Sequence, residues 1–240
     1  MTYVKTDLFD IPCLRMKPTG TSKGTVLLYH GWSSSIESYE FFASTITHWG
    51  YEAVVPELPH HGERGKLNYG EPGQLQQYFW PTVLQGLEEA KAIAFHLAGQ
   101  DARLAVIGHS MGGFIAGGVS AKVPAIRSAV VINGSCAWVK FEELYRSRLG
   151  LPASDEAQTA LGEHDPITAW SAGNDTALLL LHGTEDTTVP IDSQSYFASA
   201  APKERFRALE FVQYSGVNHQ ITLSMLQRTK GWLDDYLAGR

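Results

Sequence analysis

Three short segments of the chain carry side chains that together could perform nucleophilic catalysis. The first is Gly108-His109-Ser110-Met111-Gly112-Gly113, which follows an apolar run and precedes a stretch of small residues. A serine between glycines at a strand-to-helix turn has a strained backbone that exposes its hydroxyl, and the helix start supplies free N–H groups beneath that oxygen. Ser110 is therefore a candidate nucleophile. An ordinary helix-capping serine in a glycine-rich turn is the other interpretation of this motif.

A serine hydroxyl needs a general base beside it, and that base needs an acid that orients it. Residues 181–190, Leu-His-Gly-Thr-Glu-Asp-Thr-Thr-Val-Pro, follow an apolar run and offer two adjacent carboxylates. Residues 215–220, Ser-Gly-Val-Asn-His-Gln, contain His219 and lie between the last apolar run and the last helical period. Taken alone, each segment is only an acid in a turn or a histidine before a helix. Their occurrence after Ser110, in the order serine, acid, histidine, predicts a catalytic triad.

Six short apolar runs predict the strands that must position these segments. The middle four are continuous rather than alternating, which is typical of strands covered on both faces. The acid and the histidine, like the serine, follow such runs, and open α/β sheets form their binding crevices at the carboxyl ends of strands. The runs are Thr25–His30, Ala53–Pro56, Leu104–Gly108, Ala129–Asn133, Ala177–His182 and Phe206–Tyr214.

Helical periods separate these runs. Pro81–Leu97 opens with a proline in its first turn and repeats apolar residues along one face, and Thr222–Leu237 has a similar apolar face. Strand and helix alternate along the chain. This alternation predicts an α/β fold with a mostly parallel central sheet, right-handed crossovers and helices on both faces.

Two long segments interrupt the alternation. Residues 59–80 are polar at first and end in aromatic residues, whereas residues 134–172 begin with aromatic residues and end at Trp170. Excursions of this length in an α/β domain are usually functional or disordered, and the aromatic content favours packing over disorder. Without a repeat or a linker, the chain is predicted to be one domain, residues 1–240, with a long active-site loop at 59–80 and a small lid at 134–172.

Composition and charge exclude several classes of protein. The chain has 240 residues, of which 44% are hydrophobic and 18% charged, and this excludes an intrinsically disordered chain. A net charge of −6 without a basic run predicts no nucleic-acid partner. No internal stretch approaches the ~18 consecutive apolar residues of a membrane span, so no membrane partner is predicted.

The cysteines and the first residues of the chain bear on its compartment. Cys13 and Cys136 are the two cysteines, far apart and without a Cys-x-x-Cys motif, so they form no disulfide framework. Lys5, Asp7 and Asp10 stand where a signal peptide would place its apolar region. These features predict a cytoplasmic protein.

The chain resembles the α/β-hydrolase superfamily from about Thr25 to Leu237. It looks most like small bacterial carboxylesterases related to the prolyl-oligopeptidase-like (S9) and dienelactone-hydrolase-like branches. Glu57 is a departure, because relatives often have aspartate there. The matching segments are Tyr-His-Gly-Trp-Ser-Ser at 29–34, Pro-Glu-Leu-Pro-His-His-Gly at 56–62, the Ser110 motif at 108–113, His-Gly-Thr-Glu-Asp-Thr-Thr-Val-Pro at 182–190 and Gly-Val-Asn-His-Gln-Ile-Thr at 216–222.

The resemblance implies an activity and the residues that perform it. It implies a serine carboxylesterase that hydrolyses short-chain acyl esters through an acyl-enzyme intermediate, with a small-molecule ester as its partner and no cofactor. A thioesterase and an S9-type peptidase are the alternative enzymes. The implied catalytic residues are Ser110, His219 and Asp186, and the implied oxyanion hole consists of the backbone N–H groups of Trp32 and Met111.

A non-catalytic ligand-binding protein with the same fold is the alternative from another class. Such proteins typically lose one member of the triad, whereas all three candidates are present here. The oligomeric state is left open by the sequence.

Aromatic side chains give a candidate acyl pocket, although packing of the lid onto the domain is an equally good interpretation of them. The pocket candidates are Trp32, Phe79, Trp80, Trp138 and Phe141.

The remaining histidines are interpreted as scaffold rather than as metal ligands. His30, His109 and His182 end predicted strands beside the crevice, where we expect them to form structural hydrogen bonds. His60 and His61 are adjacent, so their side chains diverge in an extended loop, and no cysteine or carboxylate spacing completes a zinc site. No metal is predicted.

We expect kcat/KM to rise with pH through the range in which histidines titrate, because His219 must be neutral to accept the proton of Ser110. A pH–rate profile with a neutral ester substrate measures this. A flat profile from about pH 5 to about pH 8 would contradict the assignment of a histidine base.

Overall fold

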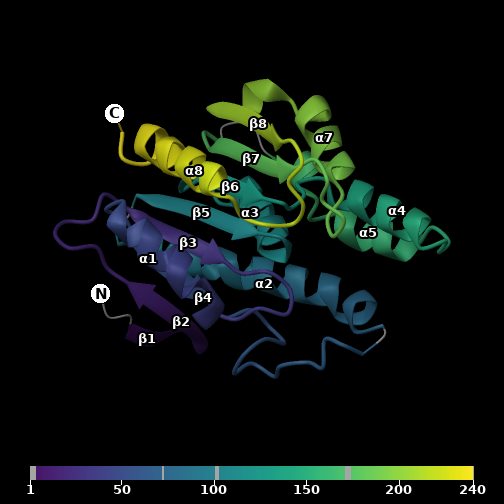
Figure 1. Ribbon diagram of the computed structural model, residues 1–240, viewed down its shortest axis with the longest axis horizontal. Coiled ribbons are helices and arrows are strands. Elements are labelled where there is room, and N and C mark those ends of the chain that lie inside the picture. Colours follow the sequence, from purple (N-terminus) through teal and green to yellow (C-terminus); the bar gives the residue numbers. More distant parts are fainter. Residues whose placement is uncertain (1–3, 72, 101–102, 171–173, 240) are drawn as a thin grey trace.

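The apolar runs assemble into one eight-stranded sheet at the centre of the molecule. The computed structural model describes residues 4–71, 73–100, 103–170 and 174–239. The strand order is β1-β2-β4-β3-β5-β6-β7-β8; β1 and β4 are antiparallel to β2, and all other neighbours are parallel (Figure 1). The predicted mostly parallel sheet is therefore confirmed. The strands are β1 (Val4–Leu8), β2 (Ile11–Met16), β3 (Thr25–Tyr29), β4 (Glu52–Pro56), β5 (Leu104–His109), β6 (Ile126–Ile132), β7 (Ala177–Gly183) and β8 (Ala208–Tyr214).

Strand register divides the apolar side chains between two layers. Leu27 of β3 pairs with Val106 of β5, Val106 with Ala129 of β6, and Ala129 with Leu178 of β7. These four residues point into one apolar layer, while their neighbours along each strand point into the other, because side chains alternate along a strand. Both layers are fully covered, which is why the central strands read as continuous apolar runs.

Helices cover both faces of the sheet, as the alternation of elements predicted. α1 and α8 lie on one face, in front of the sheet in Figure 1, whereas α2, α3 and α7 contribute to the layer on the other face. Within the described ranges, no helix is long and apolar enough to cross a membrane. The helices are α1 (Glu40–His48), α2 (Gln74–Ala98), α3 (Met111–Lys122), α4 (Trp138–Arg148), α5 (Asp155–Gly162), α6 (Pro166–Ala169), α7 (Ile191–Ala200) and α8 (Leu223–Tyr236), with the 3₁₀ turns η1 (Glu37–Tyr39) and η2 (Lys203–Arg205).

The N-terminal hairpin of β1 and β2 was not predicted from the sequence. Its two-residue turn consists of Phe9 and Asp10, both with positive φ angles, 56° and 61°. Two positive φ angles are typical of a type I′ turn, which usually contains Asn-Gly or Asp-Gly. The hairpin escaped prediction because this turn lacks those residues.

α2 begins earlier than the sequence predicted. The helix was expected to start at Pro81, but it starts at Gln74 and contains Pro81 in its interior. The last part of the predicted loop 59–80 is therefore helical. Proline at an interior position removes one helical hydrogen bond, and tertiary packing must compensate for that loss. Phe79 and Trp80 provide this packing, because their rings lie edge-to-face on Phe114 of α3 at centroid distances of 5.3 and 5.7 Å.

The predicted lid, residues 134–172, contains α4, α5 and α6 between β6 and β7. Figure 1 shows α4 and α5 beyond the carboxyl ends of the parallel strands. Asp165, which is buried, accepts hydrogen bonds from the backbone N–H groups of Trp138 and Val139 at 3.0 and 2.9 Å, and from Ile167 at 3.3 Å. One carboxylate thus caps α4 and α6 together. The function of the segment as a lid stays a prediction.

The end of β7 depends on a close approach that admits only glycine. A Cβ atom on Gly183 would lie 2.2 Å from the carbonyl oxygen of Val217, in the loop after β8. We expect Gly183→Ala to lower the free energy of unfolding by about 2–3 kcal/mol, because the two loops must separate. Thermal or urea unfolding measures the change.

Gly231→Ala is the matched control. Gly231 lies within α8, and the nearest atom to a Cβ there would be 3.8 Å away. This variant should gain about 0.5–1 kcal/mol from the better helix propensity of alanine. Equal effects at the two positions would show that the contact with Val217 is unimportant.

Candidate active site

Ser110 occupies a strained turn between β5 and α3. Its φ and ψ angles are 56° and −125°, a conformation that costs on the order of 1–3 kcal/mol for a residue with a side chain. Two hydrogen bonds hold it: its N–H donates to the carbonyl of Ile132 at 2.9 Å, and its carbonyl accepts from Gly113 at 2.8 Å. A Cβ on Gly112 would lie 2.2 Å from the carbonyl oxygen of Tyr29, so only glycine permits this turn. The motif therefore has the backbone of a nucleophile elbow.

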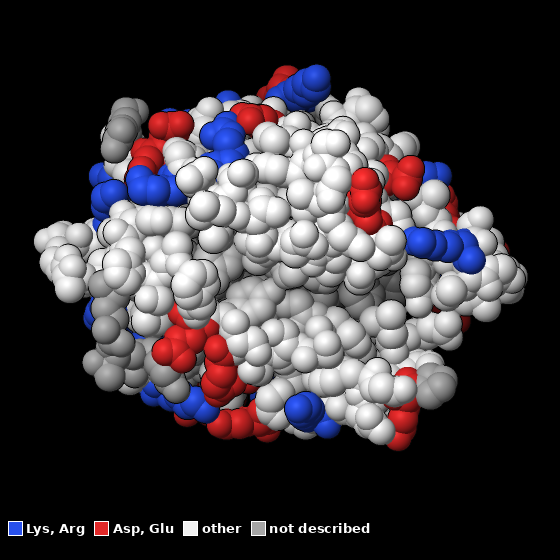
Figure 2. Space-filling view, viewed as in Figure 1, with Lys and Arg blue, Asp and Glu red and all other residues white. Residues whose placement is uncertain are grey.

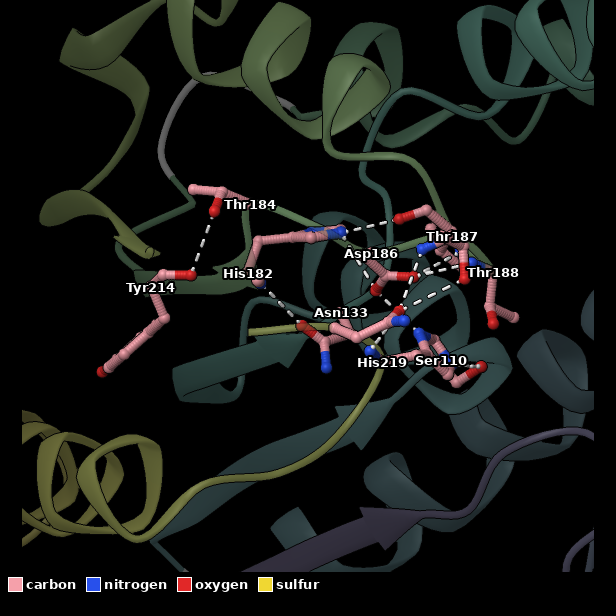
Figure 3. Close-up of polar contacts among 12 residues, drawn as sticks. Ser110, Asn133, His182, Thr184, Asp186, Thr187, Thr188, Tyr214 and His219 are labelled. Atoms are coloured by element: carbon pink, nitrogen blue, oxygen red, sulfur yellow. Dashed lines mark hydrogen bonds and ion pairs between the residues drawn. The ribbon is translucent and has the colours of Figure 1, made fainter. Parts of the chain in front are cut away.

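Ser110, His219 and Asp186 form a continuous row of hydrogen bonds (Figure 3). Nε2 of His219 lies 2.8 Å from Oγ of Ser110, and its Nδ1 lies 2.7 Å from Oδ2 of Asp186. The three residues follow β5, β8 and β7, whose carboxyl ends meet at one edge of the sheet. Ser110 and Asp186 are buried, whereas 18% of the His219 side chain is exposed. The arrangement can transfer a proton from the serine hydroxyl to the imidazole.

Asp186 is held in its charged form by four donors. Burial by itself raises the pKa of its carboxyl, but contacts with His182 and His219 outweigh burial and hold the pKa well below its usual range. Oδ1 also accepts from the backbone N–H groups of Thr188 and Val189 at 2.9 and 2.8 Å. The negative charge beside His219 therefore persists throughout the pH range in which a histidine titrates.

Two asparagines that the sequence did not single out fix the loop that carries His219. Oδ1 of Asn218 accepts from the N–H of His219 at 2.8 Å and from the N–H of Thr187 at 3.0 Å, which joins the histidine loop to the acid loop. Asn133, with a φ of 48°, accepts from the N–H of Gly183 and donates to the carbonyl of Gln220. Sequence analysis missed them because their other partners, Thr187, Gly183 and Gln220, lie 31 to 87 residues away along the chain.

The loop after β3 lies directly against Ser110. A Cβ on Gly31 would lie 3.2 Å from Cβ of Ser110. The N–H of Gly31 donates to the hydroxyl of Tyr39 at 3.2 Å, and this hydroxyl is 3.0 Å from Nδ1 of His109. Burial, together with the charge on His219, lowers the pKa of His109 to about 3, so His109 is a neutral partner. Tyr39, also missed by the sequence analysis, thus connects this loop to the serine turn.

Two more histidines fix the same loop. Nδ1 of His30 contacts the carbonyl of Gly31 at 3.0 Å, and Nε2 of His61 accepts from the N–H of Ser33 at 3.1 Å. Burial lowers the pKa of His61 to about 4, which keeps that nitrogen free to accept. Together with His182, which contacts the carbonyl of Val189 at 2.8 Å, His30 and His109 form the structural hydrogen bonds that the sequence predicted. Over the described parts of the chain, no three His, Cys, Asp or Glu side chains gather as a metal site would require.

Trp32 and Met111 are the two residues expected to supply the oxyanion hole. Trp32 follows Gly31, and Met111 is the first residue of α3. The N–H of a first helical residue has no acceptor within its own helix. Neither backbone N–H has a protein acceptor in the part of the chain that the structure describes. Both N–H groups thus lack a protein partner among the described residues, as the donors of an oxyanion hole must, and their assignment to that hole stays a prediction.

A cavity of about 350 Å³ opens beside Ser110. In the view of Figure 2, a hollow crosses the middle of the molecule, and few charged side chains border it. The walls of the cavity beside Ser110 come mainly from α2, α4 and the loops around the serine and the acid. The lining residues are Trp32, Leu75, Gln76, Phe79, Trp80, Ser110, Phe141, Glu142, Tyr145, Arg146, Leu151, Thr188 and Val189.

Four of the five predicted pocket aromatics line this cavity, and Trp138 does not. The Trp138 side chain is completely buried, packs against Trp80 at a centroid distance of 5.8 Å, and donates to the carbonyl of Ser135. It therefore supports the pocket wall from behind. The sequence analysis missed Leu75 and Gln76 because it assigned the start of α2 to a loop.

Comparisons with known proteins agree with this architecture. A family model described as "Serine aminopeptidase, S33" matches residues 20–152. The chain is 32% identical to "Esterase YjfP" of Escherichia coli (strain K12), over 90% of this chain and 91% of that protein.

Solved structures show the same fold. The crystal structure of TT1662 from Thermus thermophilus is 23% identical, with a TM-score of 0.82 over 100% of this chain and 99% of that one. A cold-adapted esterase from an Arctic intertidal metagenomic library is 18% identical, with a TM-score of 0.69 over 98% and 92% of the two chains. At these identities the likeness shows the fold alone.

We expect Asn218→Ala to lower kcat/KM for ester hydrolysis at least about tenfold, because two backbone N–H groups lose their acceptor and His219 is no longer tied to the acid loop. Steady-state kinetics with p-nitrophenyl butyrate measures the effect. The melting temperature is measured alongside, to separate loss of positioning from loss of fold.

Asn68→Ala provides the control. The amide of Asn68 donates to Glu71 in an exposed loop. Its removal should leave kcat/KM within about twofold. A similar loss of activity in both variants would contradict a positioning function for Asn218.

Proposed function

The chain belongs to the serine aminopeptidase S33 family of the α/β-hydrolases, and from that premise we propose that this hydrolase is a serine carboxylesterase acting on short-chain acyl esters. The observation that carries the proposal is the row of hydrogen bonds from Ser110 through His219 to Asp186, at 2.8 and 2.7 Å. The similarity to an esterase over nine-tenths of the chain supports the same reaction.

Acylation begins at the serine hydroxyl. Oγ of Ser110 attacks the ester carbonyl carbon while its proton passes to Nε2 of His219, and the carbonyl electron pair moves onto oxygen. Asp186, which stays charged, orients the imidazole through Nδ1 and stabilises the imidazolium. The tetrahedral intermediate then expels the alcohol, whose oxygen takes the proton from Nε2, and the acyl group remains on Ser110.

Deacylation repeats the sequence with water as the nucleophile. Nε2 of His219 accepts a proton from water as the water oxygen attacks the acyl carbon, and it returns that proton to Oγ of Ser110 as the acid leaves. Both steps pass through an oxyanion. The N–H groups of Trp32 and Met111 are the proposed donors, each contributing ~3–4 kcal/mol at the transition state.

The cavity supports a small organic ester as the substrate. Aromatic and aliphatic side chains form most of its wall, and ligand pockets of about 300–1,000 Å³ take small molecules. A thioester or a peptide could present its carbonyl to the same serine. The proposal favours esters because the relative with 32% identity is named an esterase.

We expect Ser110→Ala to lower the hydrolysis of p-nitrophenyl acetate and butyrate by ~10³-fold or more, because the nucleophile is removed. A fluorophosphonate probe should label the wild-type protein at Ser110 and leave the variant unlabelled. Parallel assays with an acyl thioester and an aminoacyl p-nitroanilide rank the three substrate classes by kcat/KM.

Ser199→Ala is the control, because Ser199 is exposed on α7 and its hydroxyl donates to the carbonyl of Tyr196 in the same helix. It should hydrolyse both esters like the wild type. If wild type and Ser110→Ala are equally slow and the probe labels neither, the protein is a non-catalytic binder. A higher kcat/KM for the thioester or the anilide would replace the ester assignment.

A further inference from the structure

One charged pair interrupts the apolar wall of the cavity. Glu142 and Arg146 lie one turn apart on α4, and both border the cavity that contains Ser110. Around them the wall consists mainly of aromatic and aliphatic side chains. In a pocket of this kind, the few polar groups determine which ligand fits and in which orientation.

Each carboxylate oxygen of Glu142 already accepts a hydrogen bond from another side chain. Oε1 accepts from Nε of Arg146 at 2.7 Å, and Oε2 accepts from the indole Nε1 of Trp80 at 2.7 Å. Only 9% of its side chain is exposed. The carboxylate therefore links α4 to α2 and orients both Trp80 and the guanidinium.

Arg146, in contrast, keeps unused donors. Nε donates to Glu142, and Nη1 donates to the carbonyl of Pro152 at 3.2 Å. Arginine has five N–H donors, and the others find no acceptor among the described residues. About a quarter of the side chain is exposed, 27%.

Arg146 also stands between two hollows. Glu142, Arg146 and Leu151 line both the cavity beside Ser110 and an adjoining hollow of about 230 Å³. The guanidinium is thus accessible to a group bound in the cavity. Glu142 is held between Trp80 and Nε of Arg146, and this structural link uses one edge of the guanidinium. It gives no function to the N–H donors that have no acceptor among the described residues.

We propose that Arg146 binds a carboxylate at the far end of the substrate, so that the preferred substrates are half-esters of short dicarboxylic acids. This inference rests on the proposed esterase function. The planar guanidinium matches a carboxylate with two parallel N–H donors, and such charge-assisted bonds are stronger where the surroundings are apolar. In this binding mode the reacting ester carbonyl lies at Ser110, and the acyl chain runs along the aromatic wall of the cavity to Arg146.

The charges around Arg146 predict the direction in which each substitution changes the preference for a carboxylate. Glu142 contacts Arg146 directly, and Glu143 borders the adjoining hollow. Glu142 repels an incoming carboxylate and weakens its attraction to Arg146, whereas Glu143 is itself paired with Lys140 at 3.2 Å. Removing the charge of Glu142 and removing the charge of Arg146 should therefore act in opposite directions, which loss of packing alone would not do.

The experiment compares kcat/KM for monomethyl glutarate and methyl valerate, and for monomethyl adipate and methyl hexanoate, by titration of the released acid. The wild type should prefer the half-ester of each pair. Arg146→Met should lower this preference about tenfold, and Glu142→Gln, which keeps an acceptor for Trp80, should raise it. Glutarate should also inhibit p-nitrophenyl butyrate hydrolysis competitively, with a higher inhibition constant in Arg146→Met.

Arg127→Met is the control, because Arg127 is exposed near the amino end of β6, away from the carboxyl ends that carry the site. It should keep the wild-type preference. Equal ratios in wild type, Arg146→Met and Glu142→Gln would overturn the proposal, as would an equal preference for dimethyl glutarate, whose tail accepts without a charge. Hydrolysis of p-nitrophenyl butyrate with no hydrolysis of either half-ester would also overturn the proposal, whereas failure to hydrolyse p-nitrophenyl butyrate as well as these methyl esters would overturn the esterase function itself.

Discussion

The parallel, in-register pairing of β5 to β8 is the constraint on which the site depends. Parallel strands end at the same edge, so the loops after β5, β7 and β8 must meet although Ser110 and His219 are 109 residues apart in the sequence. Asn133, which follows the intervening β6, bonds to Gly183 and Gln220 and so connects the end of β7 to the loop after β8. The sheet register and the hydrogen bonds between strand ends together place Ser110, His219 and Asp186 within hydrogen-bonding distance of one another.

Burial maintains the backbone conformation of Ser110 and the charge states of the groups around it. The turn at Ser110 is strained, and it persists because the apolar layers and the backbone bonds to Ile132 and Gly113 surround it. Asp186 is buried yet remains charged, because two histidines and two backbone N–H groups stabilise its negative charge. The neutral His109 and His61 hold the loop around Gly31 without adding a positive charge beside His219.

The aromatic layer between α2, α3 and α4 forms the pocket and also supports the fold. Phe79 and Trp80 pack on Phe114, and Trp80 bonds to Glu142, so the wall beside Ser110 is continuous with the packing of three helices. A polar pair inside this wall requires each partner to be satisfied. Both oxygens of Glu142 have donors within the protein, whereas Arg146 uses only part of its donors, and this difference is the ground for the proposed contact between Arg146 and the substrate.

The sequence by itself determined six of the eight strands, the helices on both faces and the candidates for the proposed triad, because continuous apolar runs and short motifs at strand ends are local properties. The choice of Asp186 over Glu185 came from the family resemblance. It did not determine the β1–β2 hairpin, whose Phe9-Asp10 turn lacks the usual residues, or the start of α2, where packing of Phe79 and Trp80 outweighs the proline. Tertiary structure alone decided that Trp138 lies behind the pocket and that Tyr39, Asn133 and Asn218 hold the site. These contacts join residues distant in the chain, and no local pattern specifies which side chains a folded sheet brings together.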